Sequence, residues 1–352
     1  MIAAPRILIL GTGSMAASHA ERFAGIAGCS LVAAVDVEPE RARAFAGRYA
    51  IPTSFGDLGE AIAWGKFDAA VNVTPDGAHK ATSLALIAAG KHVLCEKPLA
   101  VNHADAEEMA AAAEAAGVVN MVNFTYRNAA ALQAARALVG AGEIGPIRHL
   151  QASYLQSWLT AKHWGDWRTD ERWLWRLSSA HGSMGVLGDV GVHILDLATY
   201  AAGEPIVALG ARMKVFDKAE GGVIGPYRLD VNDSVAVNVE FAGGALGVVH
   251  ASRMATGKAN ELDLLLHGER GALRLWTDGQ TSTLEACLGP DIEVQRWRPV
   301  EVAPPPVIAE RFVAALQTGV NGEPDFRRGA EMQRLVDLVA ASDAAGRWLS
   351  VD

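Results

Sequence analysis

The stretch that decides the fold is Ile7-Leu8-Ile9-Leu10-Gly11-Thr12-Gly13-Ser14-Met15-Ala16. Its four apolar residues predict a short buried strand, and the Gly-x-Gly-x-x-Ala pattern that follows opens a helical segment. Gly11 permits a tight turn, Gly13 leaves space for a pyrophosphate against the backbone, and Ala16 lets the helix pack closely on the sheet. Taken alone, the pattern also fits a tight turn in another α/β domain. As a dinucleotide-binding loop, it assigns cofactor contacts to Gly11, Thr12, Gly13, Ser14 and Met15.

A carboxylate at the end of the second expected strand supports the dinucleotide interpretation. Asp36 follows Gly13 by 23 residues, close to the spacing of ~20 at which such domains place the acid that binds the ribose hydroxyls. Glu38 and Glu40 make the same loop anionic, and they would repel a 2′-phosphate even though two arginines lie nearby. The sequence therefore predicts NAD, rather than NADP, as the cofactor.

The periodicity of apolar residues divides the chain near residue 125. Before this point, short β-branched runs alternate with Ala-rich helical stretches, which is typical of a parallel sheet built from βαβ units. We expect Asn102 and Gly117 to cap one of these helices. The expected strands are Ile7–Leu10, Leu31–Asp36, Phe67–Val73, His92–Cys95 and Val118–Phe124.

After residue 125 the apolar residues recur with a period of two. Val235, Val237 and Val239 alternate with more polar residues, and later leucines repeat the pattern at spacings that suit an antiparallel meander. Three prolines, Pro304–Pro306, interrupt the chain before two closing helices. The predicted fold is an α/β Rossmann domain with a parallel sheet (1–124), followed by an α+β domain with a large, mainly antiparallel sheet (125–352).

Composition and charge limit the partners. The chain has 352 residues, 50% hydrophobic and 20% charged, which is an ordinary globular balance for about two domains. A net charge of -9 without basic runs disfavours nucleic acid, and no apolar stretch is long enough for a membrane span. The three cysteines lie too far apart for a disulfide framework or a zinc site, so we expect a cytoplasmic location.

Two loops follow the third and fourth expected strands, at the edge where open α/β sheets bind ligands. The first is Thr74-Pro75-Asp76-Gly77-Ala78-His79, and the second is Glu96-Lys97-Pro98. Pro98 lacks an N–H and is expected to end its strand and direct Lys97 outward. A solvated surface lysine is the alternative interpretation. We expect further cofactor contacts from these loops, from the end of the fifth strand and from the segment after it, by Thr74, Pro75, His79, Glu96, Lys97, Asn123 and Arg127.

Five motifs occur in order along the chain: the glycine loop, the loop Thr74–His79, Gly90-Lys-His-Val-Leu-Cys-Glu96-Lys97-Pro98, Tyr126-Arg127 and Gly188-Asp189-Val-Gly-Val-His193. Together they resemble the glucose-fructose oxidoreductase, inositol dehydrogenase and MocA family over essentially the whole chain. The resemblance implies an open-faced sheet in the second domain, substrate held between the domains, and a homodimer or homotetramer formed through the sheet face. It also implies pyranose or cyclitol substrates and catalytic roles for Lys97, Asp189 and His193.

The spacing of Asp189 and His193 agrees with a catalytic role. Four residues apart, both side chains project from one face if the segment is helical. The carboxylate could then orient the imidazole of His193 as the base that removes a hydroxyl proton. Lys97, as an ammonium group, would stabilise developing alkoxide charge. A metal site is the alternative for the pair, but Asp196 lies too far around the helix to be a convincing third ligand, and we expect no metal.

Tryptophan is concentrated just before the Asp189 motif. Such rings can stack on the apolar faces of a sugar, and a hydrophobic plug or a subunit interface fits the same pattern equally well. Five of the nine tryptophans lie here with arginines between them, namely Trp158, Trp164, Trp167, Trp173 and Trp175. With Asp166 as a further neighbour, we expect substrate contacts by Lys97, Tyr126, Trp158, His163, Trp167, Arg168, Asp189 and His193.

Three hypotheses of function follow. The first, which the resemblance favours, is an NAD-dependent dehydrogenase that oxidises a secondary ring hydroxyl of a sugar or cyclitol. The second is a redox-neutral glycosidase or lyase that retains NAD on the same scaffold. The third is a regulator that binds NAD or sugar without turnover, which the intact Lys97, Asp189 and His193 disfavour.

Overall fold

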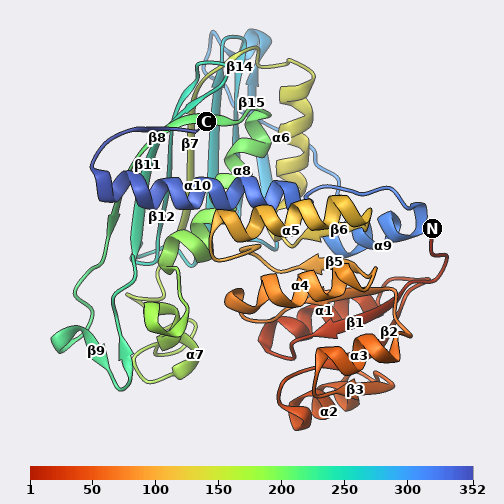
Figure 1. The fold of residues 1–352 in the computed structure, drawn as a ribbon. Coiled ribbons are helices and arrows are strands. Elements are labelled where there is room, and N and C mark those ends of the chain that lie inside the picture. Colours follow the sequence, from red (N-terminus) through yellow and green to blue (C-terminus); the bar gives the residue numbers. More distant parts are fainter. Residues whose placement is uncertain (352) are drawn as a thin grey trace. The chain divides into compact units, whose positions relative to one another are not determined.

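Two compact units can be distinguished in the computed structural model, which describes residues 1–351 (Figure 1). One unit contains Met1–Phe124 together with Pro306–Gln333, and the other contains Thr125–Pro305 together with the chain from Arg334 onward. The sequence pattern groups Pro306–Gln333 with the second domain, whereas the structure places this segment in the first unit.

A six-stranded parallel sheet forms the centre of the first unit, in the order β3-β2-β1-β4-β5-β6. This order is that of a Rossmann fold and confirms the predicted fold class. The sequence pattern misses β3, whose three residues are too few to show a period. The strands are β1 (Arg6–Leu10), β2 (Ser30–Val35), β3 (Thr53–Phe55), β4 (Ala69–Asn72), β5 (His92–Cys95) and β6 (Asn120–Val122).

Helices connect these strands and pack on the sheet. The predicted caps of α5 are confirmed, because the Asn102 side chain accepts a bond from the Asp105 N–H and Gly117 adopts a left-handed φ of 63°. The helices are α1 (Ser14–Ala24), α2 (Pro39–Arg48), α3 (Leu58–Trp64), α4 (His79–Ala88) and α5 (His103–Ala116).

The first unit also contains one complete helix and the first turns of another, up to Gln333, from the end of the chain. On α9 (Ile308–Thr318), Phe312 packs edge-on against Phe23 of α1, with ring centroids 6.5 Å apart. On α10 (Phe326–Ala345), Arg327 pairs with two glutamates of α5. A sequence pattern reveals the apolar face of such a helix but not the sheet that the face will cover, which is why this segment was grouped with the other domain.

A nine-stranded sheet dominates the second unit, in the order β16-β15-β14-β13-β7-β12-β11-β8-β17. All neighbours are antiparallel except β7 and β12, and side chains on β11 alternate between buried and exposed, as expected. The strands are β7 (Ile147–Gln156), β8 (Ile206–Lys214), β11 (Ser234–Phe241), β12 (Leu246–Ser252), β13 (Asn260–Gly268), β14 (Gly271–Thr277), β15 (Ser282–Leu288), β16 (Arg298–Pro299) and β17 (Leu349–Ser350).

Helices α6 (Ala130–Gly140) and α8 (Val192–Ala202) pack against this sheet (Figure 1). Strands β8, β11 and β12 border a shallow hollow of about 890 Å³, which includes Arg212, Ala236 and His250. Between β7 and α8 the chain forms an irregular segment that contains α7 (Glu171–Leu174), and a small hairpin of β9 (Val223–Ile224) and β10 (Tyr227–Arg228) follows β8.

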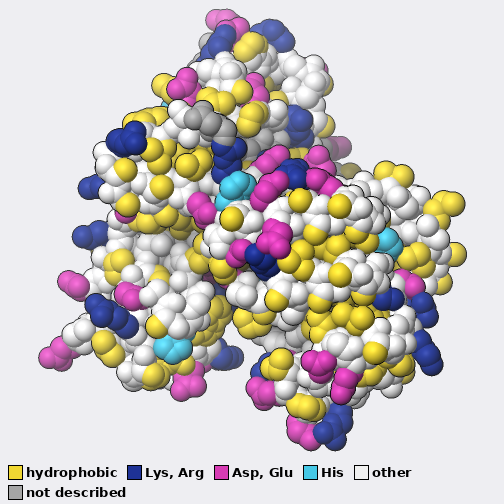
Figure 2. All heavy atoms as spheres, in the orientation of Figure 1, with side chains coloured by type: hydrophobic (Ala, Val, Ile, Leu, Met, Phe, Trp, Pro, Cys, Tyr) yellow, Lys and Arg dark blue, Asp and Glu magenta, His cyan; other side chains and the backbone are white. Residues whose placement is uncertain are grey.

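Charged side chains of both signs are interleaved on the face that Figure 2 shows. Several form ion pairs, such as Lys80 with Asp105 and Glu108. Among the helices of residues 1–351, none combines the length and the apolar character needed to cross a membrane.

Candidate active site

The glycine loop between β1 and α1 has the shape that a dinucleotide phosphate needs. Gly11 has a φ of 87°, and a Cβ there would lie 2.7 Å from the Val73 carbonyl oxygen, so that only glycine fits. Gly13 is the N-cap of α1. Apart from its two neighbours in the chain, no described residue has a heavy atom within 4 Å of a Cβ added at Gly13. The loop therefore leaves room for a pyrophosphate at the positive end of the helix.

Asp36 lies beside this loop at the end of β2 and is 8% exposed. Its Oδ2 accepts bonds from the Thr12 N–H at 2.9 Å and the Thr12 hydroxyl at 2.6 Å, and its Oδ1 accepts one from the Glu38 N–H at 3.0 Å. Burial acts to raise the pKa of Asp36, but these bonds and the nearby Arg41 guanidinium outweigh burial and lower it. Asp36 is therefore a carboxylate beside the loop, as a ribose-binding acid must be.

Glu96 is 8% exposed and is held by three neighbours. Its Oε1 lies 2.7 Å from both His19 Nε2 and Asn123 Nδ2, and its Oε2 accepts a bond from the Lys97 N–H at 3.2 Å. Burial acts to raise the pKa of Glu96, but His19 above all, with Asn123 and Lys97, lowers it to about 2. The sequence analysis missed His19, because a buried histidine on a helix carries no signal in a single sequence.

His79 lies between the Thr74 loop and the Lys97 loop and is fully buried. Its Nδ1 is 2.8 Å from the Pro98 carbonyl oxygen, and its Nε2 is 2.9 Å from the Thr74 carbonyl oxygen. Burial acts to lower the pKa of His79, but Cys95 above all, with Asp76 and the Pro98 carbonyl, raises it to about 10. A side chain without exposed surface cannot touch a cofactor, so the predicted cofactor contact of His79 is corrected to a link between two loops.

In the second unit, His193 lies in the first turn of α8 and is 6% exposed. Its ring meets Tyr126 edge-on at 5.0 Å between centroids and lies 6.4 Å from Tyr154. The two tyrosine hydroxyls are 2.5 Å apart, and Asn260 bonds to both, at 3.2 and 2.8 Å. The structure thus brings together the predicted residues Tyr126 and His193 and adds Tyr154 and Asn260, which no motif indicates.

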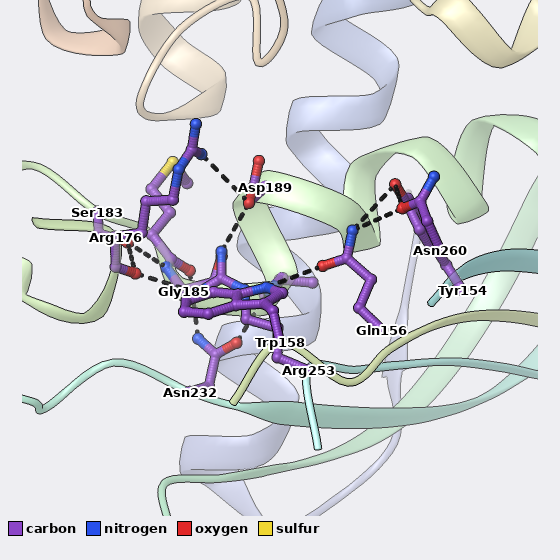
Figure 3. Close-up of polar contacts among 12 residues, drawn as sticks. Tyr154, Gln156, Trp158, Arg176, Ser183, Gly185, Asp189, Asn232, Arg253 and Asn260 are labelled. Atoms are coloured by element: carbon purple, nitrogen blue, oxygen red, sulfur yellow. Dashed lines mark hydrogen bonds and ion pairs between the residues drawn. The ribbon is translucent and has the colours of Figure 1, made fainter. Parts of the chain in front are cut away.

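Asp189 lies in a single π-helical turn, Leu187–Gly191, directly before α8. A regular helix here was only the condition for placing Asp189 and His193 on one face, and π turns recur at functional sites. The Asp189 Oδ2 accepts bonds from Arg253 Nη2 at 2.7 Å and Arg176 Nη1 at 3.4 Å (Figure 3). Arg253 is fully buried, and its Nη1 also donates to the Arg176 carbonyl at 3.0 Å. Arg253 belongs to no predicted motif, whereas Arg176 directly follows the tryptophan segment, and orientation of His193 by Asp189 stays a prediction.

Arg127, expected to bind the cofactor, is 2% exposed and lies in the second unit. Its Nε and Nη2 each donate to Asp196 at 2.7 Å, and its guanidinium lies 3.7 Å from the centre of the Tyr200 ring. This packing supports a structural role, in place of the predicted cofactor contact. It also explains Asp196, which the sequence analysis considered as a metal ligand. Within residues 1–351, no three His, Cys, Asp or Glu side chains gather into a set that could hold a metal ion.

The tryptophan segment forms a small apolar core of its own. Trp158 and Trp167 are 3% and 2% exposed and pack with four leucines. Each indole N–H donates inside the protein, to Gln156 and to the Leu159 carbonyl, both at 3.2 Å. These two rings offer no face to a sugar, which corrects their predicted substrate contacts.

The predicted contacts at the outer end of this segment remain exposed to solvent. Trp164 is 36% exposed, stacks on Trp173 and contacts the His163 ring. Arg168 covers the Trp167 ring at 4.4 Å. Asp166 pairs with Lys162. A substrate contact by His163 or Arg168 therefore stays a prediction.

Comparison with known proteins gives matches along most of the chain. A family model described as "Oxidoreductase family, NAD-binding Rossmann fold" matches residues 5–124, and one described as "GFO/IDH/MocA C-terminal domain" matches residues 132–274. Levoglucosan dehydrogenase of Pseudarthrobacter phenanthrenivorans is 27% identical over 90% of this chain and 88% of its own. The 1,5-anhydro-D-fructose reductase of Ensifer adhaerens is 33% identical over 70% of this chain and 68% of its own.

The same relation is found among solved structures. Levoglucosan dehydrogenase in complex with NADH and levoglucosan has a TM-score of 0.87, with 25% identity and coverage of 99% of both chains. The fold similarity thus extends over both units, beyond the motifs that first suggested it.

Proposed function

The chain belongs to the GFO/IDH/MocA family of oxidoreductases, and from this premise we propose that it is an NAD-dependent dehydrogenase that oxidises a secondary ring hydroxyl of a sugar or cyclitol. The observation that carries the proposal is the turn before α8, where two arginines hold the Asp189 carboxylate and His193 lies against two tyrosines. Relatives named for levoglucosan and 1,5-anhydro-D-fructose support a sugar-like substrate.

The first unit has features that suit two parts of NAD, the pyrophosphate and the ribose. The pyrophosphate would lie against Gly11 and Gly13, and the Asp36 carboxylate beside them would accept bonds from ribose hydroxyls. Arg41 Nη1 is bound to Glu38 at 3.2 Å, so the nearest positive charge is already paired. Bound NAD would supply the hydride acceptor for the carbon that carries the reacting hydroxyl.

Two side chains act on the reacting oxygen: one removes its proton and the other stabilises the negative charge that develops on it. The neutral imidazole of His193 takes the hydroxyl proton, and the tyrosine rings that pack against it fix its orientation. The Lys97 ammonium donates a hydrogen bond to the same oxygen and stabilises its developing negative charge, a contribution of about 3 kcal/mol for a comparable donor. Both groups act on one hydroxyl, which loses its proton as its carbon becomes a carbonyl.

Asp189 contacts substrate hydroxyls in this proposal. Arg253 and Arg176 hold its Oδ2, which fixes the carboxylate in position. A fixed carboxylate can then accept bonds from hydroxyls next to the one that reacts. This role suits a polyol better than a simple alcohol, because a polyol offers neighbouring hydroxyls.

The experiment that tests this function mixes the purified protein and NAD with a panel of pyranoses, anhydro sugars and inositols and follows NADH absorbance. Accumulation of NADH with at least one ring alcohol, and none with acyclic monoalcohols, is the expected result. Absence of NADH with every substrate, combined with NAD that stays bound through gel filtration, would contradict it in favour of redox-neutral chemistry.

Two further proposals concern the state of the protein. We propose a homodimer or homotetramer formed through the exposed face of β8, β11 and β12, where polar and apolar side chains are mixed around the hollow. Light scattering measures the oligomeric state directly.

We also propose a cytoplasmic location, with which the free thiols of Cys29, Cys95 and Cys287 agree.

A further inference from the structure

The ring of His79 has an unusual pair of neighbours. Both of its nitrogens face backbone carbonyl oxygens, Nδ1 toward Pro98 and Nε2 toward Thr74, at 2.8 and 2.9 Å. A carbonyl oxygen can only accept a hydrogen bond, so each of these contacts needs a proton on the histidine. The ring is fully buried, so water cannot substitute for either partner.

Only one protonation state satisfies this geometry. A neutral imidazole carries one N–H, and either tautomer would leave one nitrogen lone pair against a carbonyl lone pair. The imidazolium carries two N–H groups and bonds to both oxygens. The ionisable groups that face the ring are Cys95 of β5 and Asp76 of the turn before α4, and both favour its charged form.

The two carbonyls belong to different loops at the ligand-binding edge of the sheet. The Thr74 oxygen lies in the loop after β4, and the Pro98 oxygen lies one residue beyond Lys97, after β5. On its other side, the Lys97 N–H donates to Glu96, which His19 and Asn123 hold. The backbone around Lys97 is therefore anchored before it by Glu96 and after it by His79.

We propose that His79 is a positioning residue that acts as a buried imidazolium, tying the Thr74 loop to the Lys97 loop and so setting the place of the Lys97 ammonium relative to the cofactor loops. This inference rests on the role of Lys97 in the proposed function. His79 touches neither substrate nor cofactor and acts through the two backbone carbonyls alone.

Two substitutions separate the two bonds. The amide nitrogen of an asparagine can take the place of Nδ1, and that of a glutamine can take the place of Nε2. H79N therefore keeps the bond to Pro98 and loses the bond to Thr74, whereas H79Q does the reverse. We expect H79Q to lower kcat about tenfold with the Kd for NAD within twofold of wild type, and H79N to raise that Kd about tenfold with a smaller change in kcat. Equal effects of the two variants on kcat and on Kd would overturn the proposal.

The charge on the His79 ring can be tested by NMR, without measuring catalysis. In protein labelled with ¹³C and ¹⁵N, the ring nitrogens of His79 are assigned by correlation with the backbone signals of the same residue. At about pH 8, well above the ordinary histidine pKa of ~6.5, both should show the shift of a protonated nitrogen. A non-protonated nitrogen at that pH would overturn the proposal even if both variants fail to fold.

These readouts also separate this inference from the proposed function. The NMR measurement and the Kd for NAD need no substrate. If no sugar is oxidised but both ring nitrogens are protonated and H79N weakens NAD binding, the proposed function fails and the link between the loops stands.

Discussion

Two carboxylates of the first unit show how single residues acquire their chemistry from their partners. Asp36 is held by a hydroxyl and two backbone N–H groups, and Glu96 by an imidazole and an amide. In both cases burial acts to raise the pKa, but the hydrogen bonds to the charged form outweigh burial and lower it. Both are therefore fixed negative charges at neutral pH, one beside the glycine loop and one next to Lys97.

Lys97 and His193 are the residues on which turnover should depend most. We expect Lys97→Met and His193→Ala each to lower kcat by about 10²–10³, because one removes a preorganised donor and the other a base. Binding of NAD, measured by fluorescence titration, should stay close to that of wild type. Lys66→Met, at an exposed lysine of the same unit, is the matched control. Near-normal kcat in either variant would remove that residue from the mechanism.

Asp36 should determine the choice between NAD and NADP. Asp36→Asn keeps the size of the side chain but removes the charge that repels a 2′-phosphate, and it frees Arg41, whose Nη2 lies 3.7 Å away. We expect the ratio of kcat/KM for NAD over NADP to fall about tenfold. Glu108→Gln, at a surface carboxylate of α5 that pairs with Lys80, is the control. An unchanged ratio in Asp36→Asn would show that the carboxylate does not discriminate.

Among the elements, regular helices and strands were predicted well and irregular segments poorly. The caps of α5 and the alternation on β11 depend on a few neighbouring residues, so both could be predicted from the sequence. The π turn before α8 depends on packing, because Arg253, which follows β12, donates to Asp189 in the turn and to the Gly185 carbonyl just before it. At Gly185, φ is 71° and a Cβ would lie 2.6 Å from Asn232.

The tryptophan segment gives a test of structure against substrate binding. Trp167→Ala should lower the free energy of unfolding by about 3–5 kcal/mol, because the ring is buried and its loss leaves a cavity. Trp164→Ala should lower it by no more than about 1.5 kcal/mol, since Trp164 is partly exposed and stacks on one ring. Denaturant unfolding followed by circular dichroism measures both. If the two substitutions lowered the free energy of unfolding by equal amounts, the segment would not be a buried core with an exposed edge.

For the whole molecule, buried titratable groups predict how stability depends on pH. The pKa of His79 is raised from 6.5 to about 10, so its contribution is complete below about pH 6.5 and is lost as the pH rises to about 10. The pKa of Glu96 is lowered from 4.5 to about 2, so its contribution is complete above about pH 4.5 and is lost toward pH 2. Thermal unfolding at a series of pH values should show both declines.

Variants assign each decline to its residue. H79N should flatten the fall in Tm on the alkaline side and leave the acid side unchanged. Glu96→Gln should do the opposite. If both variants keep the slopes of the wild type, other groups cause the pH dependence.

Sequence alone determined the Rossmann sheet, its glycine loop and the meander, because glycine φ angles, caps and apolar periods are set by residues close together in the chain. Tertiary structure decided which charged groups meet. Arg253 and Asp189 are 64 residues apart, and His19 and Glu96 are 77 apart. A single sequence shows no pattern over such distances, since these partners are chosen by how distant segments pack. The ring of His79, which the sequence pointed toward a cofactor, acquired its two carbonyl partners in the same way.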